Sequence, residues 1–229
     1  MPVFTPVPIL AHAEARTATL SARHRSQLVT GHRGWLLHFR GQVLAQKGFE
    51  NYSQGIRQQA LALFGNRQHE GLMVAEGHSP RFVDEVRNST FCLVTVGNGW
   101  GHIEVPIILG CIPVLVMNDV LAPWENVLDV ASFGLRIPRA QLPSLPDTLR
   151  SLSGWRVREL QHGLARVWER YTYSSLVVAE RTRRCFVKGK STHLSSECQR
   201  SAEDATGLTG RDAIDTLMHV LKTKLLERD

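Results

Sequence analysis

The sequence predicts an α/β fold, in which helices cover both faces of a doubly wound parallel sheet. Short runs rich in β-branched residues alternate with amphipathic segments along the chain, and the links between them are short. A strand, a glycine loop, a helix and a second strand follow one another between residues 91 and 117. With 229 residues, the chain is long enough for a domain with an ample core.

The segment before residue 90 supplies the first elements. We expect a strand at 35–39 and a helix at 53–64, whose apolar residues recur at helical spacing. A short strand is expected at 72–75. A short helix is expected at 80–88, because a proline stands where its first turn would begin.

The centre of the chain is the most informative part. Residues 91–96 and 112–117 are apolar runs, each short enough for a buried parallel strand. The glycine loop 97–101 at the end of the first run leads into a predicted helix N-terminus, where phosphate groups commonly bind. The glycine spacing matches neither G-x-G-x-x-G nor a P-loop, so a tight turn without a ligand explains the glycines alone equally well.

The remaining elements extend the same pattern. A further strand is expected at 133–137, followed by helices at 142–152 and 155–173. Residues 187–208 are rich in Ser, Thr, Gly and Lys and predict a loop, and 212–226 has the pattern of an amphipathic helix.

The bulk composition limits the partners. The net charge of +6 could attract polyanions, although solvated helix faces explain the basic runs more simply. Aromatic residues are not interleaved with these runs, so we expect no nucleic-acid partner. No stretch has the length and apolar character of a transmembrane segment.

The four cysteines form two groups. Cys92 and Cys111 lie in or beside predicted buried strands and are most simply small core residues. Cys185 and Cys198 lie in a polar tail, where a disulfide suited to a lumenal compartment and two unpaired thiols are equally plausible.

A set of short motifs occurs in a fixed order along the chain. They are L-L-H-F-R-G at 36–41, R-Q-Q-A-L at 57–61, S-T-F-C-L at 89–93, G-C-I-P-V at 110–114 and P-W-E-N-V-L-D at 123–129. Together they resemble the signature of the exostosin family of glycosyltransferases, over a region from about residue 35 to 174.

The resemblance implies a domain architecture, substrates and a cellular location. It implies one Rossmann-like half of a two-domain GT-B enzyme, the half that binds the donor. We therefore expect an irregular segment at 1–34, the donor-binding domain at 35–180, a basic loop-rich tail at 181–208 and a helical end at 209–229. It further implies a UDP-sugar donor, a glycan or glycoprotein acceptor and a Golgi location, although the chain shows no signal or membrane anchor. No metal or other cofactor is expected.

The resemblance also implies donor-binding residues. Arg40, at the end of the first strand, is the expected phosphate contact; Arg57, on the next helix, is a second candidate, with a solvated helix face as the slightly favoured alternative. The glycine loop and two carboxylates complete the expected pocket: Gly97, Asn98, Gly99, Trp100, Gly101, His102, Glu104 and Asp119.

The donor loop departs from the family pattern at two positions. His102 stands where the family usually has arginine, and Val105 stands where it has an acidic residue, with Glu104 one position early. A neutral histidine lacks the permanent charge and planar fork of arginine. No catalytic residue can be assigned, since we expect the general base to come from the acceptor half. The alternative to an active transferase is a catalytically inactive exostosin-like remnant or scaffold, which binds nucleotide or acidic glycan at most.

Overall fold

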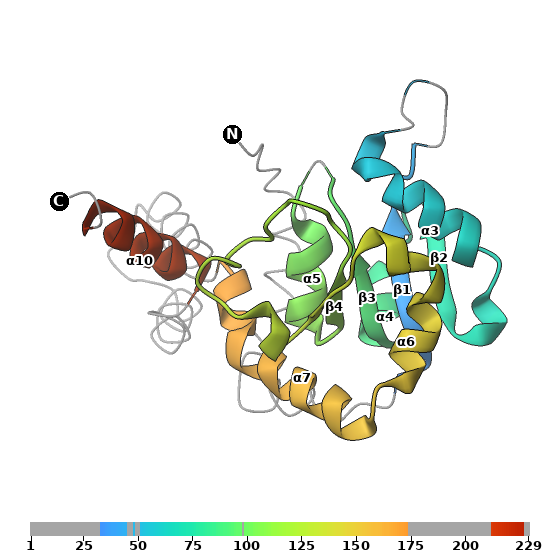
Figure 1. Ribbon diagram of the computed structural model, residues 1–229. Coiled ribbons are helices and arrows are strands. Elements are labelled where there is room, and N and C mark those ends of the chain that lie inside the picture. Colours follow the sequence, from blue (N-terminus) through green and yellow to red (C-terminus); the bar gives the residue numbers. More distant parts are fainter. Residues whose placement is uncertain (1–32, 45–47, 49–50, 98, 174–211, 227–229) are drawn as a thin grey trace, which may run out of the picture. The chain divides into compact units, whose positions relative to one another are not determined.

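The computed structural model describes residues 33–44, 48, 51–97, 99–173 and 212–226 (Figure 1). The chain divides into two compact units, and the described residues of the first unit are those up to Val167. The second unit contains residues 168–173 and 212–226 among the described ones. Each unit is described by itself.

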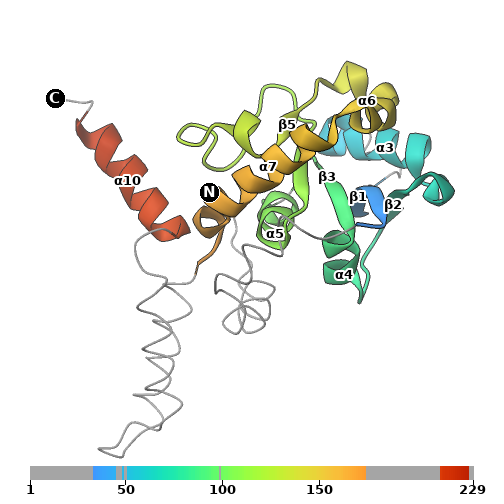
Figure 2. The same ribbon diagram turned by 90° about the horizontal axis from the view of Figure 1, so that it is seen from below.

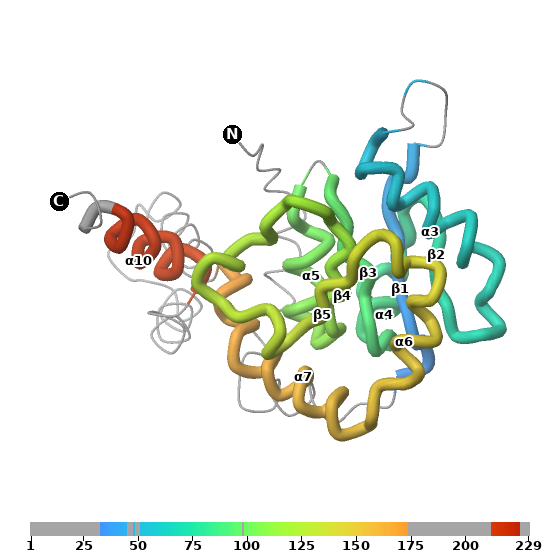
Figure 3. Tube along the Cα trace, in the orientation of Figure 1, coloured from blue at the N-terminus to red at the C-terminus, as the bar shows by residue number. Residues whose placement is uncertain are grey.

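The first unit is built on a five-stranded sheet in which every neighbouring pair is parallel (Figure 3). The strand order is β2-β1-β3-β4-β5. From β1 the chain moves to β2 on one side and then returns to β3 on the other, so the winding direction reverses between β1 and β3. This confirms the doubly wound α/β fold. The strands are β1 (Trp35–Gly41), β2 (Leu72–Glu76), β3 (Ser89–Val94), β4 (Ile112–Leu115) and β5 (Leu135–Arg136).

Helices cover both faces of this sheet (Figure 2). Helices α3 (Ile56–Phe64), α6 (Leu145–Ser151) and α7 (Gly154–Val167) lie on one face, and α4 (Phe82–Arg87) and α5 (Gly101–Leu109) lie on the other. Covered on both faces, β4 is buried along its whole length, as its apolar sequence predicts. Short 3-10 turns connect these elements: η1 (Tyr52–Gly55), η2 (Gln68–Glu70), η3 (Val130–Ser132) and η4 (Arg139–Ser144).

Several expected elements are shorter than predicted. The helix expected from residue 53 begins at Ile56, because Ser53 and Gln54 have left-handed backbones with φ of 55° and 56°. The strand expected at 133–137 contains only β5. The helix expected at 155–173 ends at Val167 and is followed by the 3-10 turn η5 (Trp168–Tyr171).

In the second unit, α10 (Ala213–Leu226) confirms the predicted terminal helix. Asp212 stands at its start, and its Oδ1 accepts hydrogen bonds from the amides of Ile214 and Asp215 at 2.9 and 3.2 Å. The tail cysteines Cys185 and Cys198 and the loop predicted at 187–208 lie outside the described residues.

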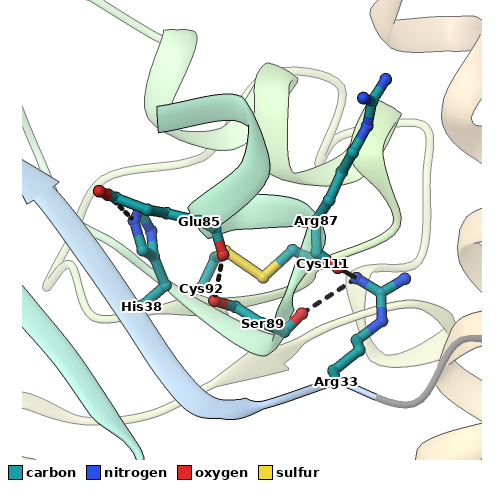
Figure 4. The surroundings of a disulfide bond; sticks show 7 residues. All are labelled: Arg33, His38, Glu85, Arg87, Ser89, Cys92 and Cys111. Carbon is teal, nitrogen blue, oxygen red and sulfur yellow. Dashed lines mark hydrogen bonds and ion pairs between the residues drawn. A yellow bond between two sulfur atoms is a disulfide. The ribbon is translucent and has the colours of Figure 1, made fainter. Parts of the chain in front are cut away.

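Cys92 and Cys111 are buried core residues, as expected, but they also form a disulfide that the sequence did not predict (Figure 4). Cys92 lies in β3, and Cys111 immediately precedes β4, the strand that pairs with β3. This register brings their Cα atoms to 5.8 Å, within the range that a disulfide requires. Both cysteines are buried, and they pack with Val86 of α4. Free cysteines and disulfide-bonded cysteines are both found buried, so the apolar sequence around Cys92 and Cys111 does not reveal that they are bonded to each other.

Candidate functional site

The candidate site lies at the carboxyl edge of the sheet, where the order of the strands reverses. In open α/β sheets, ligands bind at this topological switch point, outside the carboxyl ends of the strands. Here the switch point is formed by the ends of β1 and β3. β1 leads into Gln42 and Val43, and β3 leads through Thr95 into the glycine loop before α5. The fold therefore places the loop predicted to hold phosphate at the expected edge.

The side chain of Arg57 joins the two strand ends. Its Nε donates to Thr95 Oγ1 at 2.8 Å, just after β3, and its Nη1 donates to the carbonyl oxygen of Gln42 at 2.9 Å, just after β1. Nη1 also donates to the hydroxyl of Tyr52 at 3.2 Å. One guanidinium thus spans the switch point.

This guanidinium is an unusual buried charge. Arg57 is only 2% exposed, so the expectation of a solvated position is wrong. It lies on the face of α3 that also carries Ala60 and Phe64, both of which are buried. Its carbon Cζ lies 5.6 Å from the ring centroid of Phe39 and 5.2 Å from that of Tyr52, a cation–π arrangement.

The hydrogen-bond partners of Arg57 among the described residues are all formally neutral, namely two hydroxyls and a carbonyl. Its Nη2 is buried and has no hydrogen-bond partner in the described part of the chain. Burial lowers the pKa of Arg57, but an arginine remains protonated in proteins. The switch point therefore holds a positive charge that its described hydrogen-bond partners do not neutralise.

Two glycines allow the chain to approach these side chains closely. A Cβ at Gly97 would lie 2.3 Å from Arg57 Nη2, and a Cβ at Gly41 would lie 2.8 Å from His102 Cε1. Gly99 and Gly101 differ, since a Cβ at either position would meet nothing within 4 Å. A side chain at position 97 would thus displace the Arg57 guanidinium, while the later loop glycines face open space. Asn98, between them, lies outside the described residues.

His102 in the first turn of α5 is held as a neutral side chain. Its ring stacks on Phe39 with centroids 5.9 Å apart. Burial, together with the nearby Arg57 and His38, lowers the pKa of His102 to about 4. At neutral pH this position therefore adds no positive charge beside Arg57.

The Arg40 side chain forms an ion pair with Glu85. Its Nε and Nη2 donate to the two carboxylate oxygens of Glu85 on α4, at 2.7 and 3.2 Å. The same carboxylate accepts a hydrogen bond from Ser79 Oγ at 2.8 Å and lies 3.3 Å from His38 Nε2. Burial raises the pKa of Glu85, but these hydrogen bonds outweigh it and lower the pKa overall. This pairing holds the Arg40 guanidinium against α4, and its role as a phosphate contact stays a prediction.

The other expected site residues lie along the same edge. Trp100 occupies the N-cap position of α5, and Glu104 lies in the first turn of that helix. Asp119 is exposed beyond the end of β4, with a left-handed backbone at φ 56°. Beside it, the side chain of Gln54 forms two hydrogen bonds with the main chain of Asn118. Its Nε2 donates to the carbonyl oxygen at 3.0 Å, and its Oε1 accepts from the amide at 3.2 Å. The structure brings these residues to one edge, and their roles as donor contacts stay predictions.

Sequence reasoning missed Thr95, Tyr52 and Gln54. The position of Thr95, directly after a buried strand that precedes a glycine loop, was an available signal. Tyr52 and Gln54 gave none, because their contacts depend on the left-handed turn before α3.

Comparison with known proteins identifies the family. The family model of the Exostosin GT47 domain matches residues 3–152, which is more than half of the chain. The chain belongs to the exostosin family of glycosyltransferases. This confirms the resemblance drawn from the sequence motifs.

Relatives of this exostosin-family chain match over shorter regions. An Exostosin-1 homolog of Caenorhabditis elegans is 31% identical over 103 residues, which are 44% of this chain and 27% of the relative. Exostosin-1 of Drosophila melanogaster is 35% identical over 88 residues, which are 38% of this chain and 12% of the relative. A probable glucuronosyltransferase of Oryza sativa subsp. japonica is 24% identical over 104 residues, covering 44% and 24% of the two chains. The chain therefore matches about a quarter or less of the length of each of these relatives.

Two further findings on the exostosin-family chain concern ions and membranes. Within the described ranges, no group of three or more His, Cys, Asp or Glu side chains is placed to hold a metal ion. In the same part of the chain, no helix combines the length and the apolar character needed to span a bilayer.

Proposed function

We propose that this exostosin-family chain binds a nucleotide sugar, specifically a UDP-sugar, at the β1/β3 switch point and serves transfer of the sugar to a glycan acceptor. The observation that carries the proposal is the Arg57 guanidinium, buried at this point with formally neutral hydrogen-bond partners in the described chain. Burying a charge costs free energy unless an opposite charge compensates it. A bound diphosphate would supply that charge.

The loop above Arg57 offers the remaining part of a phosphate site. Helix α5 begins at Gly101, and the amides of Ile103 and Glu104 donate to the carbonyl oxygen of Trp100, so the amides of Gly101 and His102 are the ones that precede the first hydrogen bond of the helix. These amides and the helix dipole favour an anion at the N-terminus. The open space beside Gly99 and Gly101 lets a ligand approach the backbone there. Because Gly97 covers Arg57, we expect the guanidinium to act on the diphosphate mainly through its electric field in a poorly solvated setting.

We place this activity in the secretory pathway, at the Golgi. Disulfides persist in oxidising compartments and are rare in the cytosol. The buried Cys92–Cys111 disulfide supports that placement, and it lies in the strand that leads to the proposed site.

A non-catalytic exostosin-like module is the second candidate. The observation in its favour is His102, whose pKa of about 4 leaves it uncharged where the family usually has arginine. Val105, in place of the family's acidic residue, points the same way. A module of this kind would keep the fold and bind nucleotide weakly or not at all.

Titration calorimetry with UDP tests the proposal. We compare the wild type with Arg57→Met, which removes the charge but keeps most of the volume, and with Arg57→Lys, which keeps the charge. Arg40→Met is the matched control, because it removes an arginine from the end of β1 whose guanidinium is paired with Glu85. Thermal unfolding of each variant shows whether it is folded.

We expect Arg57→Met to weaken UDP binding on the order of tenfold or more, and Arg57→Lys to weaken it less. Arg40→Met should change the affinity little. An equal loss in Arg57→Met and Arg40→Met would make Arg40 the phosphate contact after all. A folded wild type that does not bind UDP at millimolar concentration would refute the proposal and leave the non-catalytic module.

A further inference from the structure

We propose that Asn88 carries an N-linked oligosaccharide. The triplet Asn88-Ser89-Thr90 has the form N-x-S/T, in which x is not proline, and this is the acceptor pattern for N-glycosylation. The sequence contains one other such triplet, Asn51-Tyr52-Ser53. Short triplets of this kind also occur by chance, so the argument depends on where the structure places each asparagine.

Asn88 stands on the surface, between the end of α4 and the start of β3. Its side chain is exposed, and its Oδ1 accepts a hydrogen bond from the amide of Gly34 at 2.9 Å. The main-chain oxygen of Asn88 accepts another from the amide of Trp35 at 2.8 Å. Both oxygens of Asn88 thus hold the segment that enters β1, while the modification uses its nitrogen, Nδ2.

That nitrogen belongs to an exposed side chain and lies close to Gly34. A Cβ at Gly34 would lie 2.8 Å from Nδ2, so any side chain at position 34 would crowd the atom to be modified. Glycine at this position avoids the clash. The hydrogen bond from Gly34 uses Oδ1 of this exposed side chain, so modification of Nδ2 does not remove the acceptor.

The chemistry requires a lipid-linked oligosaccharide diphosphate as the second reactant. The bond between its anomeric carbon and the diphosphate oxygen breaks, with the electron pair remaining on that oxygen. A bond from the anomeric carbon to Nδ2 forms, and Nδ2 releases one proton to the solvent. The lipid diphosphate leaves. An amide N–H and the carbonyl Oδ1 remain on the modified side chain, so Oδ1 still accepts the hydrogen bond from Gly34.

The disulfide is an independent observation that supports passage of the chain through the compartment in which N-glycosylation takes place. Cys92 lies four residues after Asn88, on the same strand as Ser89, and pairs with Cys111 in the buried layer between the sheet and α4 (Figure 4). N-glycosylation and disulfide formation both take place in the lumen of the secretory pathway. Ser89 is itself buried and donates from its Oγ to the carbonyl oxygen of Glu85 at 2.6 Å, so the folded triplet is well anchored.

The position of Asn88 also separates the glycan from the candidate ligand site. Ser89 and Val94 are the two ends of β3, so Asn88 lies at the amino edge of the sheet and the switch point at the carboxyl edge. At about 3.3 Å per residue, the length of β3 separates them by roughly 20 Å. Asn51, in contrast, directly precedes Tyr52, whose hydroxyl contacts Arg57, and a glycan there would stand beside the site. We therefore assign the modification to Asn88 and not to Asn51.

The test is to secrete the 229-residue chain from cultured animal cells behind a cleavable leader and to treat it with peptide N-glycosidase. Thr90→Val removes the acceptor pattern but leaves Asn88 and its hydrogen bonds intact, whereas Asn88→Gln would disturb the contact with Gly34. Thr90→Ser restores the pattern and is the rescue control. Ser53→Ala removes only the second triplet.

We expect the glycosidase to increase the gel mobility of the wild type, Thr90→Ser and Ser53→Ala, and to leave Thr90→Val unchanged. Peptide mass mapping of the treated wild type should find aspartate in place of Asn88. An unmodified, disulfide-bonded wild type would overturn the proposal. So would a mobility shift that persists in Thr90→Val but disappears in Ser53→Ala, since it would assign the glycan to Asn51.

Discussion

Removing the disulfide between Cys92 and Cys111 should destabilise the first unit by an amount that follows from the chain length it closes. The two cysteines are separated by 19 residues. Cross-linking a loop of about this size reduces the entropy of the unfolded chain enough to stabilise the fold by about 3 kcal/mol. We expect the double substitution Cys92→Ala with Cys111→Ala to lose about that much, and somewhat more because two buried sulfurs are removed.

Urea unfolding followed by tryptophan fluorescence and by circular dichroism measures this loss. For a chain of this size, about 3 kcal/mol corresponds to a fall in melting temperature of roughly 6–12 °C. In reducing agent the stability of the wild type should fall towards that of the variant, and the variant should respond to the reducing agent less than the wild type does. A variant within about 1 kcal/mol of the oxidised wild type would refute the reasoning, as would a wild type that is indifferent to reduction.

Two further predictions concern the candidate site. The pKa of His102 in the folded chain is about 4, below its ordinary 6.5, so the unfolded chain binds more protons between these values and stability rises with pH there. We expect stability to fall as the pH drops from about 6.5 towards 4, and urea unfolding at several pH values should show a smaller fall in His102→Gln; an unchanged slope would contradict the assignment. Gly97→Ala should lower both the melting temperature and the affinity for UDP, because its Cβ would displace Arg57 Nη2. Gly99→Ala has open space for its Cβ and should leave the melting temperature unchanged; an equal fall in melting temperature in these two variants would contradict the packing argument.

The central elements of the fold could be predicted because their sequences leave little choice. The strands β3 and β4 are apolar runs buried on both faces, and the loop between them is marked by glycines. The backbone of Ser53 and Gln54 could not be predicted, since left-handed conformations are unusual for residues other than glycine. The helix α3 therefore begins three residues later than the sequence predicts.

The two arginines show why the site was harder to predict than the fold. Arg57 has the spacing of a core position on α3, but an arginine at such a position is usually interpreted as solvated, and only tertiary contacts show its burial. Arg40 stands at the expected strand end, yet its partner Glu85 is 45 residues away in sequence. Pairings across such distances depend on the strand order and on which face each residue occupies. Such pairings therefore cannot be predicted from a single sequence.

The measurement that tests the central claim most directly is a comparison of UDP with uridine on the wild type and on Arg57→Met. If the guanidinium acts on the diphosphate, the substitution should weaken UDP on the order of tenfold and leave uridine within about twofold, so that the two ligands lose unequal amounts of binding free energy. Equal losses for UDP and uridine would contradict the account, because Arg57 would then support the fold of the site and not the charge of its ligand.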